Sequence, residues 1–304
     1  MSATPSLSWR TAALMTVPPL LWAANAVIGR LMGPLVPPLT LNFMRWVLAA
    51  LVLLPLAPAL LRAGSPLRTH WRRFALLGLL SIGLYNALQY QALQTSTALN
   101  VTLVAGSMPA FMLAIGALGY GQRVSARQLF GAALSMVGVL VVLTQGHPER
   151  LAALRFVPGD LFMLLATAVW AWYSWLLTDT RADPPGLRSD WAAFLLAQVL
   201  PGAAWAGLFA AAEQGLGSPV PIQWGGPMAL ALAFIAVGPA VLAYRIWGMG
   251  VQRLGPTLSG FFSNLTPLFA AVMSGLFLGE APGWHHGLAF ALIVGGIAVS
   301  SRRG

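Results

Sequence analysis

The chain alternates long apolar runs with short polar connections from one end to the other. Each run holds close to the 20 residues that a helix needs to cross the hydrocarbon core of a bilayer. Backbone polar groups inside lipid must be satisfied within the segment, so the pattern predicts helices. The predicted spans are about 11–30, 38–61, 73–93, 98–119, 127–144, 159–178, 190–212, 227–249, 256–278 and 284–301. We therefore expect an all-α integral membrane protein with ten transmembrane helices.

Composition removes the soluble alternatives. The chain has 304 residues, of which 58% are hydrophobic and only 8% charged, whereas soluble domains carry about 25% charged residues. Ten spans leave too few residues for a soluble enzyme or binding domain. No cysteine is present, which excludes disulfides and thiolate metal sites. We expect no cofactor and no metal, and a lipid bilayer and a small-molecule substrate as partners.

The net charge of +10 indicates how the chain is oriented in the membrane and does not indicate a nucleic-acid-binding surface. All 17 basic residues are arginines, scattered singly or in pairs at the ends of the apolar runs, whereas a nucleic-acid face would form a cluster or stripe. With the N-terminus inside, twelve arginines fall in one set of loops and tails and three in the other. Arg45 and Arg245 lie within spans. The positive-inside rule then places both termini in the cytoplasm.

The two halves of the chain, residues 1–150 and 151–304, read as repeats of five spans each. A shift of 158 residues places Pro109 on Pro267, and it also matches turn glycines of the two halves. An odd number of spans means that the second half enters the membrane from the opposite side. Inverted repeats with helices broken at corresponding positions are typical of alternating-access transporters.

Several short motifs, taken in order, resemble the EamA branch of the drug/metabolite transporter superfamily. They are Trp22-Ala23-Ala24-Asn25, Asn42-Phe43-Met44-Arg45-Trp46, Gly159-Asp160-Leu161, Trp170-Ala171-Trp172-Tyr173 and Leu278-Gly279-Glu280. Gln122 departs from the pattern, where the family often has Glu. The resemblance implies two inverted five-helix repeats and a bacterial inner-membrane carrier of small metabolites. It also implies that helices one to four and six to nine line the path, with helices five and ten outside it.

Arg45 is the most informative polar residue, because it lies about eight residues into the second span, roughly 12 Å from the membrane surface at 1.5 Å per residue. A charge at that depth costs at least about 2.5 kcal/mol. Three interpretations stay open: attraction of a substrate carboxylate, a structural tie to carbonyl groups, and snorkelling to the surface. Asn25 and Asn42 lie at a similar depth, so they are either path-lining residues or hydrogen-bonding links between helices.

Aromatic residues also gather at mid-depth. Helical spacing predicts that Trp170 and Tyr173 share one face while Trp172 and Trp175 share another, so one pair can face the interior and the other lipid. Packing explains such rings as well as a solute pocket does. The predicted central site comprises Trp22, Asn25, Asn42, Arg45, Tyr85, Gln89, Trp170, Tyr173 and Tyr244.

Glycine and proline predict where helices bend. Pro109 and Pro267 interrupt helical hydrogen bonding near mid-span, and Gly106 and Gly260 soften the same helices, which makes these four the candidate gating or hinge residues. A static kink explains them equally well. Spacings of the GxxxG type at Gly29–Gly33, Gly275–Gly279 and Gly283–Gly287 are weak indications of helix packing.

These features favour a secondary transporter that exports amino acids or similar amphipathic metabolites, and they indicate no enzyme. No ATP-binding motif is present, and no pair of catalytic residues shares a helix face. All seven acidic residues lie in loops or at span ends, whereas proton-coupled carriers commonly keep a carboxylate at mid-membrane. We therefore expect facilitative transport, with a proton- or sodium-coupled carrier and a channel as alternatives. The sequence leaves the solute and the oligomeric state undetermined.

Overall fold

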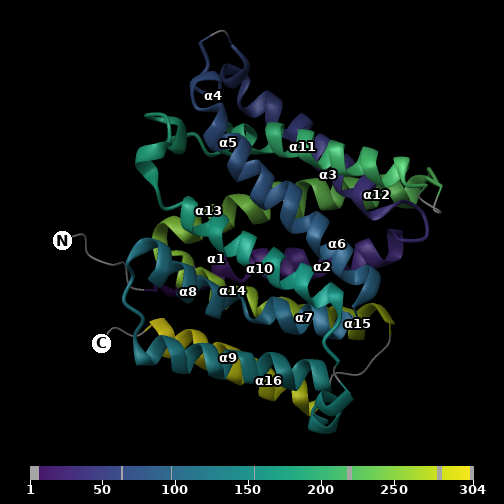
Figure 1. Ribbon diagram of the computed structural model, residues 1–304, viewed down its shortest axis with the longest axis vertical. Coiled ribbons are helices and arrows are strands. Elements are labelled where there is room, and N and C mark those ends of the chain that lie inside the picture. Colours follow the sequence, from purple (N-terminus) through teal and green to yellow (C-terminus); the bar gives the residue numbers. More distant parts are fainter. Residues whose placement is uncertain are drawn as a thin grey trace.

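The computed structural model describes residues 7–62, 64–96, 98–153, 155–217, 221–278 and 283–301, and these residues form helices and connections (Figure 1). The first half holds α1 (Trp9–Met15), α2 (Val17–Met32), α3 (Pro38–Leu53), η1 (Leu54–Leu56), η2 (Pro58–Leu61), α4 (Pro66–Thr69), α5 (Trp71–Gly78), η3 (Leu79–Leu84), α6 (Tyr85–Thr95), α7 (Ala98–Gly106), α8 (Met108–Tyr120) and α9 (Ala126–Thr144). The second half holds η4 (Pro148–Ala153), α10 (Pro158–Leu176), η5 (Thr180–Ala182), η6 (Leu187–Ser189), α11 (Trp191–Gly215), α12 (Gly226–Ile235), η7 (Ala236–Leu242), α13 (Ala243–Leu254), α14 (Pro256–Ser263), α15 (Leu265–Leu278) and α16 (Trp284–Ser301).

Each predicted span coincides with one helix or with consecutive helical pieces. Within the described residues, six helices are long and apolar enough to cross a membrane. A seventh crossing follows if the bent pair Asn100–Gly106 and Met108–Tyr120 counts as one span. The prediction of an all-helical, multi-span protein is thus confirmed, while the full set of ten crossings stays a proposal. Gly279, Glu280, Arg302 and Arg303 lie outside the described residues.

Two spans contain a stretch of π-helix that the sequence did not reveal. In the first half η3 separates α5 from α6, and in the second half η7 separates α12 from α13. The two stretches correspond under the shift of about 158 residues that relates the halves. Pro239 lies inside η7, where its missing N–H accounts for a local change of helical pattern. π-helical turns of this kind occur frequently at functional sites.

The predicted breaks near Pro109 and Pro267 are present, but the helix is interrupted just before each proline. The first break falls at Ser107 and the second at Asn264, and the first bends the span by 42°. Each proline then lies in the first turn of the following helix. A proline costs little there, because the first N–H groups of a helix have no intrahelical acceptor.

Helices α9 and α16 pack against each other as an antiparallel pair along one edge of the molecule (Figure 1). A Cβ added to Gly131 would lie 2.7 Å from the carbonyl oxygen of Gly296, and a Cβ on Gly296 would lie 2.6 Å from that of Gly131. One heptad along, a Cβ on Gly138 would lie 3.0 Å from the carbonyl oxygen of Ala289. The missing side chains let the two backbones approach closely, as small residues do in membrane helix pairs.

These contacts also relate the two halves to each other. A shift of 158 residues converts Gly131 into Ala289 and Gly138 into Gly296, so the contact Gly131–Gly296 becomes the contact Ala289–Gly138. This backbone contact therefore occurs twice in the interface, once at each of two positions that the repeat relates. By contrast, a Cβ added to Gly29 or Gly287 would meet no atom within 4 Å, so these two glycines do not mark a close helix contact. The spacing Gly275–Gly279 lies partly outside the described residues and stays a prediction.

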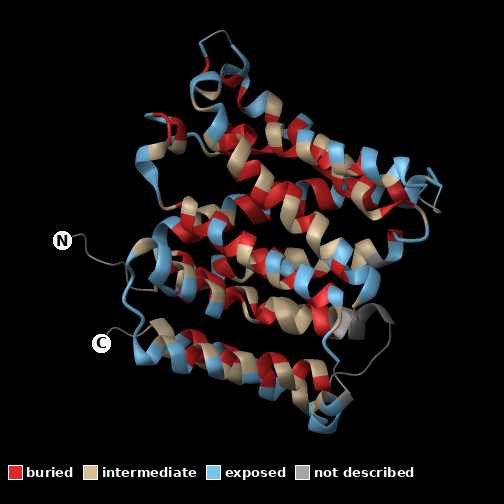
Figure 2. Ribbon diagram, in the orientation of Figure 1, coloured by how far each residue is buried: buried red, intermediate tan, exposed pale blue. Residues whose placement is uncertain are grey.

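Burial divides the helices into central and peripheral ones (Figure 2). In the most apolar stretch of α11, 56% of the residues are buried, whereas the share is 28% in α9 and 22% in α16. The outer faces of α9 and α16 present Leu129, Phe130, Leu288 and Phe290, which suits contact with lipid. The polar and aromatic residues described next lie among the central helices.

We predict that Gly296→Ala destabilises the protein, because the new methyl group would meet backbone atoms of α9 that cannot move aside. Overpacking of this kind typically costs about 1–3 kcal/mol. Gly287→Ala in the same helix is the matched control, and it should be neutral or stabilising, since alanine is the better helix former. Thermal unfolding of both purified variants measures the difference, and equal melting temperatures would contradict the proposed contact.

Candidate functional site

Trp170 of α10 is the centre of an aromatic cluster in the middle of the molecule. Its ring centroid lies 5.4 Å from that of Trp22, 5.0 Å from Tyr85 and 5.4 Å from Tyr244. Tyr173, one helical turn further on, lies 5.3 Å away. Four different membrane segments, those of α2, α6, α10 and α13, therefore contribute the five predicted aromatic residues to one cluster.

Two further rings belong to this cluster that the predicted site did not include. Trp247 lies 5.4 Å from Trp22 and 5.6 Å from Trp170, and Trp46 lies 4.9 Å from Tyr244. Both side chains are fully buried. Trp247 follows Tyr244 by three residues, a spacing that places both on one helix face, and Trp46 directly follows Arg45. These two signals were available in the sequence.

Hydrogen bonds fix the orientation of the polar edges of the rings. The Tyr173 hydroxyl donates to Oε1 of Gln198 at 3.1 Å, and the Tyr244 hydroxyl donates to the carbonyl of Ser81 in η3 at 2.8 Å. The indole N–H of Trp247 donates to the Ser174 hydroxyl at 3.2 Å. Buried tyrosine and tryptophan normally find such partners, so the cluster is held in one defined arrangement.

Arg45 lies beside this cluster and is surrounded by amide oxygens. Its Nη1 donates to Oδ1 of Asn25 at 3.2 Å, and its Nη2 donates to Oδ1 of Asn42 at 2.5 Å and of Asn86 at 3.1 Å. The three amides come from α2, α3 and α6, and the side chain is buried, with 6% of the residue exposed. Snorkelling is therefore the wrong interpretation, while the structural and substrate-facing interpretations both remain.

The amides themselves are oriented by the π-helical stretch η3. Asn86 donates from Nδ2 to the carbonyl of Ile82 at 3.1 Å, and Asn42 approaches the same carbonyl at 3.4 Å. Both side chains thus turn their oxygen atoms toward Arg45. Trp46 connects the two parts of the site, because its indole N–H donates to Oδ1 of Asn42 at 3.1 Å and its ring lies 5.2 Å from the Arg45 guanidinium carbon.

In this conformation the rings occupy the centre by packing on one another. Trp170 is 4% exposed, while Trp22, Tyr85, Asn25 and Gln89 are half-buried. Gln89 lies on α6 one turn after Tyr85. The nine predicted residues thus lie on central helices, and the closest packing is around Trp170.

The second predicted pair of rings on α10 divides between two environments. Trp172 is 43% exposed on the outer face of the helix, as expected for contact with lipid. Trp175 is buried instead, donates from its indole to the carbonyl of Met112 at 2.8 Å, and stacks on Tyr120 at 4.8 Å. The prediction that Trp172 and Trp175 share one environment is therefore wrong, because only Trp172 is exposed.

The two candidate hinge glycines lie at close contacts between helices. A Cβ on Gly106 would lie 2.8 Å from Cγ1 of Val139 in α9, and one on Gly260 would lie 2.7 Å from Cγ of Met112 in α8. Close packing therefore gives a sufficient reason for glycine at both positions. Their role as hinges stays a prediction.

An ion-pair cluster ties α5 to the connection between α10 and α11, and sequence reasoning did not identify it. The Asp183 carboxylate accepts from Nε of Arg73 at 3.2 Å and from Nε of Arg188. Arg73 also donates from Nη2 to the carbonyls of Leu176 at 2.5 Å and Asp179 at 3.3 Å. The carboxylate is almost completely buried. The pairing joins α5 to a connection more than a hundred residues away, so no local pattern could have revealed it.

Two more carboxylates accept hydrogen bonds near helix ends, one at the start of α10 and one near the end of α11. Asp160, at the start of α10, accepts from the Ser96 hydroxyl, from Nδ2 of Asn100 at 3.1 Å and from the backbone N–H of Val157 at 2.9 Å. Glu213, near the end of α11, accepts from the backbone N–H groups of Leu39 at 3.0 Å and Thr40 at 2.8 Å. A carboxylate at a helix N-terminus is favoured by the helix dipole.

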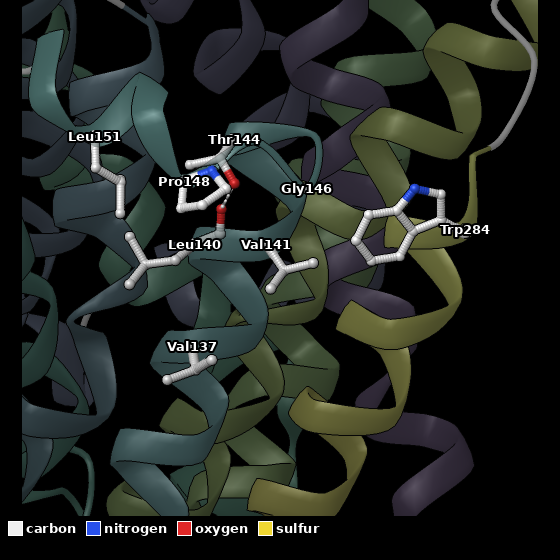
Figure 3. Close-up of a pocket in the computed structure, with 8 residues that line it drawn as sticks. All are labelled: Val137, Leu140, Val141, Thr144, Gly146, Pro148, Leu151 and Trp284. Atoms are coloured by element: carbon white, nitrogen blue, oxygen red, sulfur yellow. Dashed lines mark hydrogen bonds between the residues drawn. The ribbon is translucent and has the colours of Figure 1, made fainter.

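A separate groove of about 280 Å³ lies on the outer side of α9 and α16 (Figure 3). It is lined by Val137, Leu140, Val141, Thr144, Gly146, Pro148, Leu151 and Trp284. No charged side chain lines it, and it lies away from the aromatic cluster. An apolar groove on a peripheral helix pair gives no means of recognising a polar solute, so we do not include it in the candidate site.

Comparison with known proteins gives two matches to one family model within this chain. The model of the EamA-like transporter family matches residues 9–144 and again residues 157–302. The chain is 26% identical to the aromatic amino acid exporter YddG of Ancylobacter novellus, over 93% of both chains. It is 25% identical to a probable amino-acid metabolite efflux pump of Salmonella typhimurium, over 86% of this chain and 84% of the other. A solved crystal structure with 24% identity superposes with a TM-score of 0.75, over 95% of this chain and 96% of that one, so the two share a fold.

We predict that Asp183→Asn destabilises the protein, because two largely buried guanidinium groups would lose their common carboxylate. Removing one partner of a buried ion pair typically costs about 3–5 kcal/mol. Asp190→Asn is the matched control: Asp190 caps α11 by accepting from Ala192 and Ala193, and asparagine caps a helix equally well. Thermal unfolding tests the pair of variants, and an unchanged Asp183→Asn protein would show that the cluster contributes nothing.

Proposed function

Because this chain belongs to the EamA-like transporter family, whose members are transporters and not enzymes, we propose that it exports small amphipathic metabolites across a bacterial inner membrane. Neutral amino acids, aromatic ones among them, are the proposed solutes. The names of two relatives, an aromatic amino acid exporter and a probable amino-acid metabolite efflux pump, support this class of solute. The proposed location is a multi-pass one with both termini in the cytoplasm, on the arginine distribution.

The observation that carries the proposal is the aromatic cluster next to a buried cation. Apolar rings accommodate the side chain of an amphipathic solute, and a small number of polar groups fix its orientation. Trp170 contacts rings from α2, α6 and α13, so a solute at this point lies between helices of both halves. The proposed binding residues are those predicted from the sequence, with Trp46 and Trp247 added.

We further propose ten crossings arranged as two inverted five-helix repeats, residues 1–150 and 151–304. Support comes from the two matches to one family model, from the paired π-helical stretches and from the duplicated contacts between α9 and α16. Alternating access in such a scaffold moves one repeat against the other around a central site. In the present conformation the rings fill that site, so the solute enters by separating them.

Transport is proposed to be facilitative. Of the acidic residues that the structure describes, Asp160 and Glu213 lie within one or two turns of helix ends, and the others lie in connections. None lies beside Trp170 or Arg45. A mid-membrane carboxylate that could take up and release a proton is therefore absent from the described part of the cluster, and the solute gradient drives export.

We predict that Trp170→Ala lowers the affinity for an aromatic solute about tenfold, since each ring contact contributes about 0.5–1.5 kcal/mol. Trp172→Ala removes the same side chain from the lipid-facing side of the same helix and should transport at the parental rate. Counterflow of L-phenylalanine into liposomes measures both, with thermal unfolding to confirm that each variant is folded. Parental affinity in a folded Trp170→Ala protein would remove the cluster from the pathway.

We predict that solute equilibrates across proteoliposomes without regard to ion gradients. Purified protein is reconstituted with equal L-phenylalanine on both sides, and a pH or sodium gradient is then imposed. Facilitative transport leaves the two concentrations equal, because no ion is coupled to the movement of the solute. Net accumulation driven by either gradient would instead identify a proton- or sodium-coupled carrier.

A further inference from the structure

Arg45 carries a buried positive charge that no carboxylate neutralises among the described residues. Its three hydrogen-bond acceptors are neutral amide oxygens. The ion pairs among the described residues are formed by Arg73, His147 and Arg188 instead. Amides solvate a guanidinium group but leave its charge in place. A buried charge without a counter-ion is costly, and in a low-dielectric interior it strongly attracts an anion.

The donors of Arg45 are not all used. Its Nε is buried and has no hydrogen-bond partner, although a guanidinium group offers five N–H donors in a planar fork. Nη1, with two hydrogens, makes a single hydrogen bond, to Asn25. Unused guanidinium donors also occur at Arg188, but Arg188 is neutralised by the Asp183 carboxylate, whereas Arg45 has no carboxylate beside it among the described residues. The arrangement leaves capacity for one more acceptor.

Asn25 is the least buried of the three amides, because Asn42 and Asn86 are buried and Asn25 is half-buried. We therefore take it as the amide that a ligand would displace. Trp22 precedes Asn25 by three residues and shares its helix face, and its ring lies 5.4 Å from that of Trp170. A solute among the rings therefore reaches Arg45 by displacing one amide.

We propose that the α-carboxylate of the transported solute is the missing counter-ion of Arg45, taking the place of the Asn25 amide on the guanidinium group while the solute side chain lies among the rings. This inference rests on the proposed function and adds the group that selects the solute: a carboxylate next to an apolar or aromatic side chain. Arg45 then has two sets of partners, neutral amides in the empty protein and a carboxylate in the loaded one.

Two probes that differ only at the carboxylate separate this role from a structural one. L-Phenylalanine carries the carboxylate, and L-phenylalaninol carries an alcohol in its place. A charge-assisted hydrogen bond contributes about 1.5–3 kcal/mol, so the wild-type protein should bind L-phenylalanine about ten- to hundredfold more tightly. Tryptophan fluorescence of the protein in nanodiscs measures affinity, and counterflow in liposomes measures transport of each probe.

Arg45→Gln should weaken binding of L-phenylalanine by that factor and leave L-phenylalaninol unchanged or bound more tightly, because the repulsion between two cations is removed. Arg245→Gln is the matched control: Arg245 is exposed and lies 4.0 Å from the ring centroid of Trp191, and its removal should preserve the preference. If Arg45→Gln weakens both probes equally, Arg45 is a structural tie and the inference is wrong.

Asn25→Asp gives a second test that keeps Arg45 in place. It sets a permanent carboxylate at the position whose oxygen now lies 3.2 Å from Nη1, so the protein supplies its own counter-ion. Affinity for L-phenylalanine should fall and affinity for L-phenylalaninol should rise, with thermal stability kept or increased. Unchanged affinity for L-phenylalanine in this variant would also overturn the inference.

The outcomes distinguish this inference from the proposed function. If the wild-type protein moves both probes with equal affinity, the carboxylate is not recognised and the inference alone fails. If the folded wild-type protein moves neither probe and binds neither, amino acid export itself is wrong, and the role of Arg45 in it is lost as well.

Discussion

Inside a bilayer no water is available to a polar group, so every N–H, carbonyl and charge must find its partner within the chain. Most of the specific structure of this protein follows from that constraint. The carboxylate of Asp160 caps the start of its own helix α10, and that of Glu213 binds the start of α3. The carbonyls of Ser81 and Ile82 accept from Tyr244 and Asn86. Three amides surround one arginine. Arg45 combines an unused donor with a charge that no described carboxylate neutralises, and this combination is the basis of the proposed carboxylate ligand.

The helices and the membership of the central cluster could be predicted from the sequence, because both follow from local spacing. An apolar run of about 20 residues indicates a helix, and polar or aromatic residues at mid-depth indicate the interior. Tyr85, Trp170 and Tyr244 were found in this way. Trp46 and Trp247 carry the same kind of local signal beside Arg45 and Tyr244, but local spacing does not show which rings meet across helices far apart in sequence.

Other features depend on three-dimensional packing and could not be predicted. The Asp183 cluster joins α5 to a connection more than a hundred residues away. The packing glycines Gly131 and Gly296 form no GxxxG motif with each other, because they lie on different helices. The helix break falls at Ser107 and not at Pro109, since proline is compatible with the first turn of a helix but not with its middle.

The π-helical stretches η3 and η7 have a consequence for how the two halves tolerate change in length. A π turn holds an extra residue relative to the α-helix around it, and each residue of an α-helix turns the chain by about 100°. Deleting one residue from Leu79–Leu84 would therefore let this turn close with the α-helical pattern and leave the helices on either side in their present orientation. Tyr85 and Asn86 would keep facing Trp170 and Arg45. A deletion elsewhere in the same span has no π turn to absorb it, so it would rotate the helix face beyond it by about 100°.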